Sequence, residues 1–211
     1  MSVSPRRALI VIDVQNEYFT GNLPIEYPPV ETSLPNIVLA IATARANKTP
    51  VILVQHDAPE ESPIFAKGSH GWQLHPAINE MTADHRINKI MADVFAETDL
   101  KQWLSANNID TLTITGYMTH NCNASTIYHA AHEGYKVEYL SDATGALPYE
   151  NAGGKASAEE IHRVFSTVFH STFAAVVTTQ EWVDAVNNNS VLEPENVYVS
   201  NLRARSAREN S

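Results

Sequence analysis

The stretch Thr111-Leu112-Thr113-Ile114-Thr115-Gly116-Tyr117-Met118-Thr119-His120-Asn121-Cys122 decides the fold class and holds the only cysteine of the chain. The β-branched run from Thr111 to Thr115 predicts a short buried strand, which Gly116 ends. Asn121 is a good N-cap, and residues 122–133 then predict a helix. A buried strand that leads directly into a helix indicates a unit of a parallel α/β sheet.

Cys122 falls in the first turn of this predicted helix, where unpaired N–H groups and the helix dipole favour an anion. The thiol pKa in such a place is lowered from about 8.5 into roughly the 3.5–7.5 range, which favours a nucleophile. The alternative is that this lone cysteine is a small buried hydrophobic residue.

Strand-like and helix-like segments alternate along the rest of the chain. Further strands are predicted at residues 8–14, 50–55, 86–90, 136–140 and 174–177. Helices are predicted around residues 34–42, at 99–106 with Thr98 as cap, and after the caps Ser157/Glu160 and Thr178/Glu181. Six strands alternating with helices predict an α/β fold with a parallel sheet and helices on both faces. We expect a single domain over residues 1–199 and a mobile polar tail over residues 200–211.

The composition is that of an ordinary enzyme. Of 211 residues 44% are hydrophobic, and no apolar run approaches the roughly 20 residues that span a membrane. The net charge of −10, from 14 basic and 24 acidic residues, argues against nucleic acid as the main partner. One cysteine excludes an intramolecular disulfide, and Met1 to Ala8 has no signal-peptide core, so a cytoplasmic location is expected.

Ligands of parallel α/β sheets bind outside the carboxyl ends of the strands. Asp13 closes the first apolar strand, which favours a general base over a helix cap or turn residue. Lys89 lies near the end of the weak third strand, where it is either an edge charge or a cation that holds a thiolate. Together with Cys122 they form a set suited to covalent catalysis, and the long loops 18–33 and 57–87 are expected to act as lids or binding loops.

Four pieces of the sequence resemble the isochorismatase-like cysteine hydrolases, a family that includes nicotinamidases and carbamoylsarcosine amidase. They are residues 9–17 (LIVIDVQNE), Lys89, residues 116–122 (GYMTHNC), and residues 130–137 with 141–144 (AAHEGYKV and SDAT). The resemblance runs from about Ala8 to Val186. It implies a three-layer α/β sandwich with a six-stranded parallel sheet.

The same resemblance implies the roles of several residues. Asp13, Lys89 and Cys122 would form the catalytic triad of a hydrolase that needs no cofactor. A cis peptide would join Tyr117 to Met118. The Met118 and Cys122 amides would then form an oxyanion hole.

The cysteine favours cleavage of a C–N bond in a small amide, ureido or carbamoyl compound through a thioester, because isochorismatases proper lack it. The alternatives are a vinyl-ether hydrolase and a noncatalytic binding protein of the same fold. A redox role would need a second, resolving cysteine. The pocket is expected to include Phe19, Trp72, His120 and Asn123, with a subunit contact as the alternative place for Trp72.

No metal site is predicted. Nicotinamidases have an Asp-x-His pair, whereas the order here is His56-Asp57. The loop histidines His56, His70 and His75 lack a clear ligand spacing and are expected to be simple polar residues, with zinc ligands as the alternative. A homo-oligomer is expected, with Trp72 and residues 144–151 at the subunit contact. No membrane or nucleic-acid partner is expected.

Overall fold

The computed structural model describes residues 4–209, which fold around a six-stranded sheet in the order β3-β2-β1-β4-β5-β8. All five neighbouring pairs of strands are parallel, which confirms the predicted α/β class. The strands are β1 Arg7–Ile12, β2 Val51–His56, β3 His85–Lys89, β4 Thr111–Tyr117, β5 Lys136–Gly145 and β8 Ala175–Val177. All six predicted strands are present, with ends shifted by a few residues.

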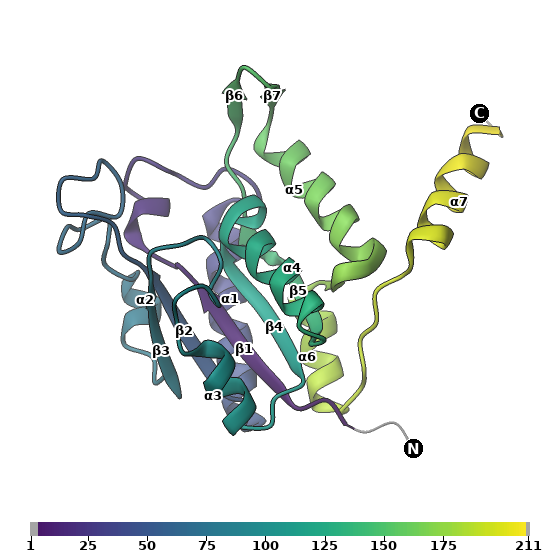
Figure 1. Ribbon diagram of the computed structural model, residues 1–211, viewed down its shortest axis with the longest axis horizontal. Coiled ribbons are helices and arrows are strands. Elements are labelled where there is room, and N and C mark those ends of the chain that lie inside the picture. The colour runs from purple at the N-terminus through teal and green to yellow at the C-terminus, as the bar shows by residue number, and fades with distance from the viewer. Residues whose placement is uncertain (1–3, 210–211) are drawn as a thin grey trace.

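The helices cover both faces of the sheet and make three layers (Figure 1). On one face lie α1 Val30–Ala46 and α6 Thr179–Asn187, and on the other lie α3 Leu100–Ala106, α4 Ala124–His132 and α5 Ala158–Val168. β1 is buried on both sides: Ile10 and Ile12 pack toward α3 and α4, whereas Leu9 and Val11 pack toward α1. Because both faces of this central parallel strand are covered, its residues 8–12 form an unbroken apolar run.

Local caps begin two of the helices as predicted. Ser157 with Glu160 and Thr178 with Glu181 each form a complete capping box. The predicted cap at Asn121 is wrong, because the helix begins earlier: the π-helical turn η2 Thr119–Asn123 follows the extended residue Met118 and continues into α4. Asn121 and Cys122 thus lie inside the first turn.

Several short or terminal elements were not predicted. The short hairpin of β6 Tyr149–Asn151 and β7 Gly154–Ala156 extends beyond the sheet, and α7 Val197–Glu209 projects away from the domain (Figure 1). The segment expected to be a mobile tail from residue 200 is thus helical up to residue 209, and the remaining residues lie outside the described part. Across residues 4–209, no helix combines the length and apolarity of a membrane span.

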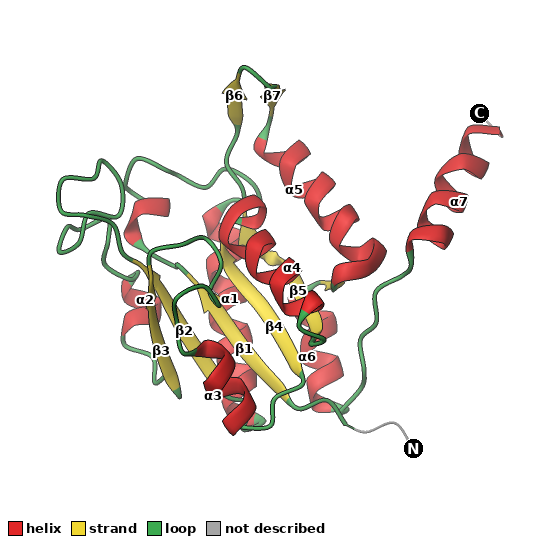
Figure 2. Ribbon diagram, viewed as in Figure 1, coloured by secondary structure: helices red, strands yellow, loops and turns green. Residues whose placement is uncertain are grey.

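Shorter elements and loops complete the end of the sheet where the strands terminate (Figure 2). η1 Asn16–Tyr18 lies there, and α2 Pro76–Asn79 leads from there back to the start of β3. The π-helical turn η3 Phe169–Phe173 instead joins α5 to the start of β8. The two long loops expected from the sequence lie at this end and meet each other: the Asn22 side chain donates to the Pro63 carbonyl oxygen at 2.8 Å, and Thr20 Oγ1 lies 3.3 Å from His70 Nε2. Both loops are therefore held next to the carboxyl ends of β1 and β2.

Candidate active site

Three elements of the sheet bring Asp13, Lys89 and Cys122 together. Asp13 directly follows β1, Lys89 is the last residue of β3, and Cys122 lies in η2 after β4. They meet at the carboxyl edge of the sheet, where β1 lies between β2 and β4 and the chain direction of the crossovers reverses. All three side chains are almost completely buried.

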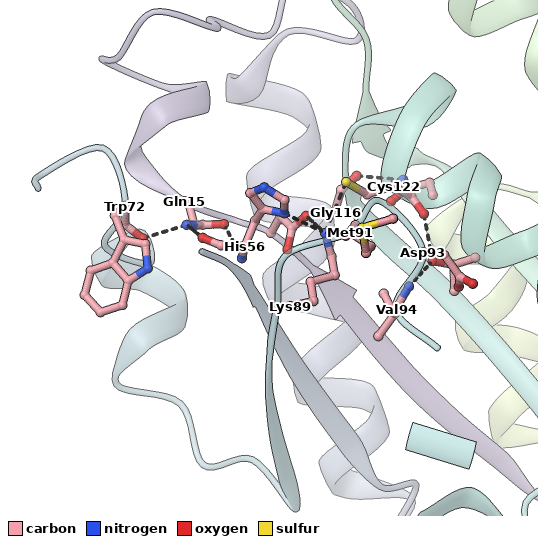
Figure 3. A network of polar contacts seen from close by, with 12 residues as sticks. Gln15, His56, Trp72, Lys89, Met91, Asp93, Val94, Gly116 and Cys122 are labelled. Atoms are coloured by element: carbon pink, nitrogen blue, oxygen red, sulfur yellow. Dashed lines mark hydrogen bonds and ion pairs between the residues drawn. The ribbon is translucent and has the colours of Figure 1, made fainter. Parts of the chain in front are cut away.

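Lys89 is the centre of this group (Figure 3). Its Nζ lies 2.7 Å from Asp13 Oδ2 and 3.2 Å from Cys122 Sγ. The same ammonium contacts the Met91 carbonyl oxygen at 3.1 Å and His56 Nδ1 at 3.3 Å. Burial alone would lower the pKa of Lys89, but the Asp13 carboxylate and Cys122 outweigh it and the pKa is raised. Lys89 is therefore a charged cation held between the Asp13 carboxylate and the Cys122 thiol.

The electrostatics of Cys122 differ from the sequence-based expectation. Burial and the nearby Asp13 carboxylate raise the pKa of the thiol to about 12, and the Lys89 ammonium opposes this only in part. The prediction of a lowered pKa is wrong, because a thiolate loses more by leaving water than it gains from Lys89. The resting site thus holds a neutral thiol beside a carboxylate, and no N–H or O–H group of residues 4–209 donates to Asp13 Oδ1. That oxygen is left to accept the thiol proton.

The backbone at Asp13 is held in an uncommon conformation by its neighbours. Asp13 has φ 50°, in the left-handed region that aspartate tolerates better than most residues. Two residues on, the Gln15 side chain donates to the carbonyl oxygens of His56 and Trp72 at 3.0 and 2.7 Å, and it accepts the His56 N–H at 2.9 Å. Gln15 therefore ties the end of β1 to the end of β2 and fixes the carboxylate.

A close approach of two strands positions the turn that carries Cys122. Gly116 has φ 97°, and a Cβ atom there would lie 2.1 Å from the Ile12 carbonyl oxygen, so only glycine fits. Asn123 donates to the Gly116 carbonyl at 2.9 Å, and Thr126 donates to the Cys122 carbonyl at 2.7 Å. The peptide bond between Tyr117 and Met118 is cis.

A cavity of about 290 Å³ opens in front of Cys122. We call it the Cys122 cavity, and its lining is Tyr18, Leu23, His56, Ala58, Ser62, Ile64, Phe65, Ala92, Met118, Asn121 and Cys122. Most of these residues come from the two long loops, as lids or binding loops require. From the sequence, His56 was considered only as a loop histidine, although it ends β2 and the strand-end rule that selected Asp13 and Lys89 also selects it.

The four residues expected in the pocket lie around this cavity and have other partners. Phe19 packs on His75 and Tyr117, and the Trp72 indole donates to Asp57 Oδ1 at 2.7 Å. His120 contacts the Tyr149 ring, and burial, with His162 nearby, lowers its pKa to about 4. The Asn123 side chain donates to the Gly116 carbonyl oxygen. The lining of the cavity is thus a different set of residues.

The loop histidines are dispersed. His70 Nε2 lies 3.3 Å from Thr20 Oγ1, and His75 Nδ1 accepts the Ala77 N–H at the start of α2. His56 alone lies in the site. Among residues 4–209, no cluster of three or more His, Cys, Asp or Glu side chains is arranged to hold a metal ion.

Known structures share this fold over most of the chain. An isochorismatase domain matches residues 7–181. A crystal structure of an isochorismatase-type protein from Burkholderia xenovorans LB400 is 58% identical, with a TM-score of 0.97, and the match covers 98% of this chain and 100% of that one. A cysteine hydrolase from Pseudomonas syringae pv. phaseolicola 1448A is 27% identical, with a TM-score of 0.81, over 87% of this chain and 93% of that one.

Curated relatives of similar sequence include an isochorismatase effector and an amidase. The secreted isochorismatase effector Isc1 of Verticillium dahliae is 30% identical over 77% of this chain and 87% of its own length. The N-carbamoylsarcosine amidase of an Arthrobacter species is 28% identical over 62% of this chain and 56% of its own length.

Proposed function

This chain belongs to the isochorismatase family, and from that premise we propose that it is a cysteine-dependent hydrolase that cleaves the C–N bond of a small amide, ureido or carbamoyl compound. The single observation that carries the proposal is the contact of Lys89 Nζ with both Asp13 and Cys122. A noncatalytic binding protein has no need of a buried acid, cation and thiol in mutual contact. Relatives described as a cysteine hydrolase and an amidase support the same class.

The first half of the reaction moves one proton and forms one bond. Asp13 takes the Cys122 thiol proton as the sulfur attacks the carbonyl carbon, so the free thiolate, disfavoured by burial, never accumulates. The Lys89 ammonium offsets the negative charge on sulfur as it forms. Asp13 then gives its proton to the leaving nitrogen, which departs as an amine or ammonia and leaves a thioester on Cys122.

The tetrahedral intermediate needs donors for its oxyanion. We assign this role to the Met118 and Cys122 amides, which flank the turn from β4 into α4. Donors of this kind contribute roughly 3–4 kcal/mol each to transition-state stabilisation in other hydrolases.

In the second half of the reaction, Asp13 deprotonates a water that attacks the thioester, and the proton returns to sulfur as the acid leaves.

A panel of small compounds tests the proposed activity. Primary amides, ureas and carbamoyl compounds are incubated with the enzyme, and ammonia release is measured against a heat-inactivated control. We expect at least one class to release ammonia with saturation kinetics. Hydrolysis of a vinyl ether but of no amide would contradict the C–N assignment.

We expect activity to survive exhaustive chelation. The three catalytic groups contact one another directly, and the loop histidines have separate partners, so no step needs a metal. Turnover is measured before and after prolonged EDTA dialysis, with metal content determined in parallel. Activity that is lost on dialysis and restored by zinc or another divalent ion would reverse this prediction.

We also propose that the protein is a homo-oligomer, although the surfaces suggested by the sequence support it only at Tyr149, which is 42% exposed. Leu147 is buried in its own subunit and Trp72 is half-buried. Further support comes from exposed apolar side chains on α7, where Tyr198 is 74% and Leu202 49% exposed one helical turn apart. A 13-residue helix is marginal in water unless an apolar face is covered.

Light scattering at micromolar concentration measures the assembly. We expect a mass that is a multiple of 23.3 kDa and a return to 23.3 kDa in the variant Tyr198→Asp/Leu202→Asp. The control is Asn201→Asp, which adds a charge on the same helix outside this pair. A wild-type mass of 23.3 kDa would contradict the proposal.

A further inference from the structure

The lining of the Cys122 cavity carries information about the substrate. Among its eleven residues there is no Asp, Glu, Lys or Arg. Most of the surface is apolar, from Leu23, Ala58, Ile64, Phe65, Ala92 and Met118. At about 290 Å³ the cavity is at the small end of the roughly 300–1,000 Å³ typical of ligand pockets. It therefore admits a small molecule with an apolar body.

The two ionisable groups that face the cavity beside Cys122 are uncharged at neutral pH. Burial and the Lys89 ammonium lower the pKa of His56. Burial, with Cys122 and Asp13 nearby, raises the pKa of the Tyr18 phenol. Beneath them the charge of Lys89 is balanced by Asp13 at 2.7 Å. A charged group on the substrate would thus lose its hydration without gaining a counter-ion.

Three polar side chains of the lining have a polar atom without a hydrogen-bond partner among residues 4–209: those of Tyr18, His56 and Asn121. The Tyr18 phenol is almost fully buried, which leaves His56 and Asn121 as the better placed pair for a ligand. His56 Nδ1 faces the Lys89 ammonium at 3.3 Å and so acts as acceptor, which leaves the imidazole proton on Nε2. Within residues 4–209 neither His56 Nε2 nor the Asn121 side-chain amide has a hydrogen-bond partner. Ser62 differs, because its hydroxyl is bonded to the Ile64 backbone. His56 offers one donor, and Asn121 offers both a donor and an acceptor.

We propose that the substrate is a small uncharged amide with an apolar acyl group, and that His56 Nε2 and the Asn121 side chain bind its polar end. The identification of the substrate as an amide with an acyl group rests on the proposed function. The uncharged character of the cavity stands apart from the reaction, so the two are tested separately.

Matched amides test the preference under turnover. 4-Methylpentanamide and succinamate have nearly the same shape, but the second carries a carboxylate; butyramide and β-alaninamide differ likewise by an ammonium. We expect kcat/KM, from ammonia release, to be at least about 100-fold higher for each neutral member. A charged member that is hydrolysed within tenfold of its neutral partner would overturn the proposal and leave the amidase function intact.

Alkylation of the only cysteine tests the cavity without any turnover. Iodoacetamide is neutral and iodoacetate is an anion of similar size, and both react with Cys122 alone. The ratio of their rates, iodoacetamide over iodoacetate, is compared with the ratio for glutathione. We expect the protein ratio to be at least about tenfold larger. An equal or smaller ratio would overturn the proposal even if amides are hydrolysed, whereas a larger ratio without amide hydrolysis would reject only the proposed function.

The role of His56 is tested by the variant His56→Leu. Loss of a hydrogen bond to substrate should raise KM for the best neutral amide about tenfold with kcat within threefold. His56→Gln, which keeps an amide donor, should recover part of this loss. The control is the exposed His132→Leu, which lies outside the cavity. A fall in kcat at unchanged KM would show that His56 acts only by holding Lys89, and would overturn its assignment to the substrate.

Discussion

Replacing Cys122 by alanine should lower kcat/KM by at least about 10⁴-fold, because no other group in the cavity is a nucleophile held against a base. Without sulfur there is no thioester path, and Asp13 would have to activate water from a position built for a thiol. The fold should persist, since the change removes one buried atom and costs about 1 kcal/mol.

The measurement combines kinetics with a structural control. Ammonia release is followed for wild type, Cys122→Ala and the near-isosteric Cys122→Ser, and circular dichroism with urea unfolding shows that the variants fold. Mass spectrometry of wild type during turnover should also show the mass of the acyl group on Cys122. An alanine variant that keeps more than a few per cent of activity would disprove the nucleophile assignment.

The second large effect concerns the buried ion pair of Asp13 and Lys89. Lys89→Met leaves the Asp13 carboxylate without its cation, and Asp13→Asn leaves the ammonium without its anion. An unpaired buried charge typically costs about 3–5 kcal/mol, so each single variant should lose that much free energy of unfolding. Asparagine suits the first position because it tolerates the φ of 50° found there.

The double variant Asp13→Asn/Lys89→Met separates stability from catalysis. It removes both charges, so its loss of free energy of unfolding should be smaller than the sum of the two single losses by about 1–3 kcal/mol in a double-mutant cycle. The activity of all three variants should be at least about 10²-fold below that of wild type, because the general base or its partner is missing. Urea unfolding midpoints and ammonia release measure the two effects. Additive stability losses would show that the pair is not coupled.

Most of the fold followed from the sequence alone. Apolar runs such as residues 8–14 and 50–55 predicted buried parallel strands, because a strand covered on both faces needs no polar residues. Ser157 and Thr178, each followed three residues later by glutamate, predicted helix starts because a capping box is a local structure. Asp13, Lys89 and Cys122 were selected because each falls where a strand ends.

Other features depended on contacts between distant segments. The Cys122 pKa was mispredicted from the helix start, since burial and the Asp13 carboxylate are set by tertiary packing rather than by sequence position. The start of α4 was misplaced at Asn121 because a π-helical turn after Met118 replaces an ordinary cap. The short hairpin of β6 and β7 has too few residues to give a periodic signal.

The sequence thus determined the parallel sheet and the positions of the three proposed catalytic residues at strand ends, because strand burial, helix caps and strand ends are local patterns. Only the tertiary structure decided what surrounds these residues. Tyr18 and Phe65 come from loops whose paths are fixed by side chains such as Glu17, which accepts the Asn22 and Phe65 N–H groups at 2.5 and 3.4 Å. Such loops have no sequence period, and their packing alone places an apolar, uncharged lining over Cys122.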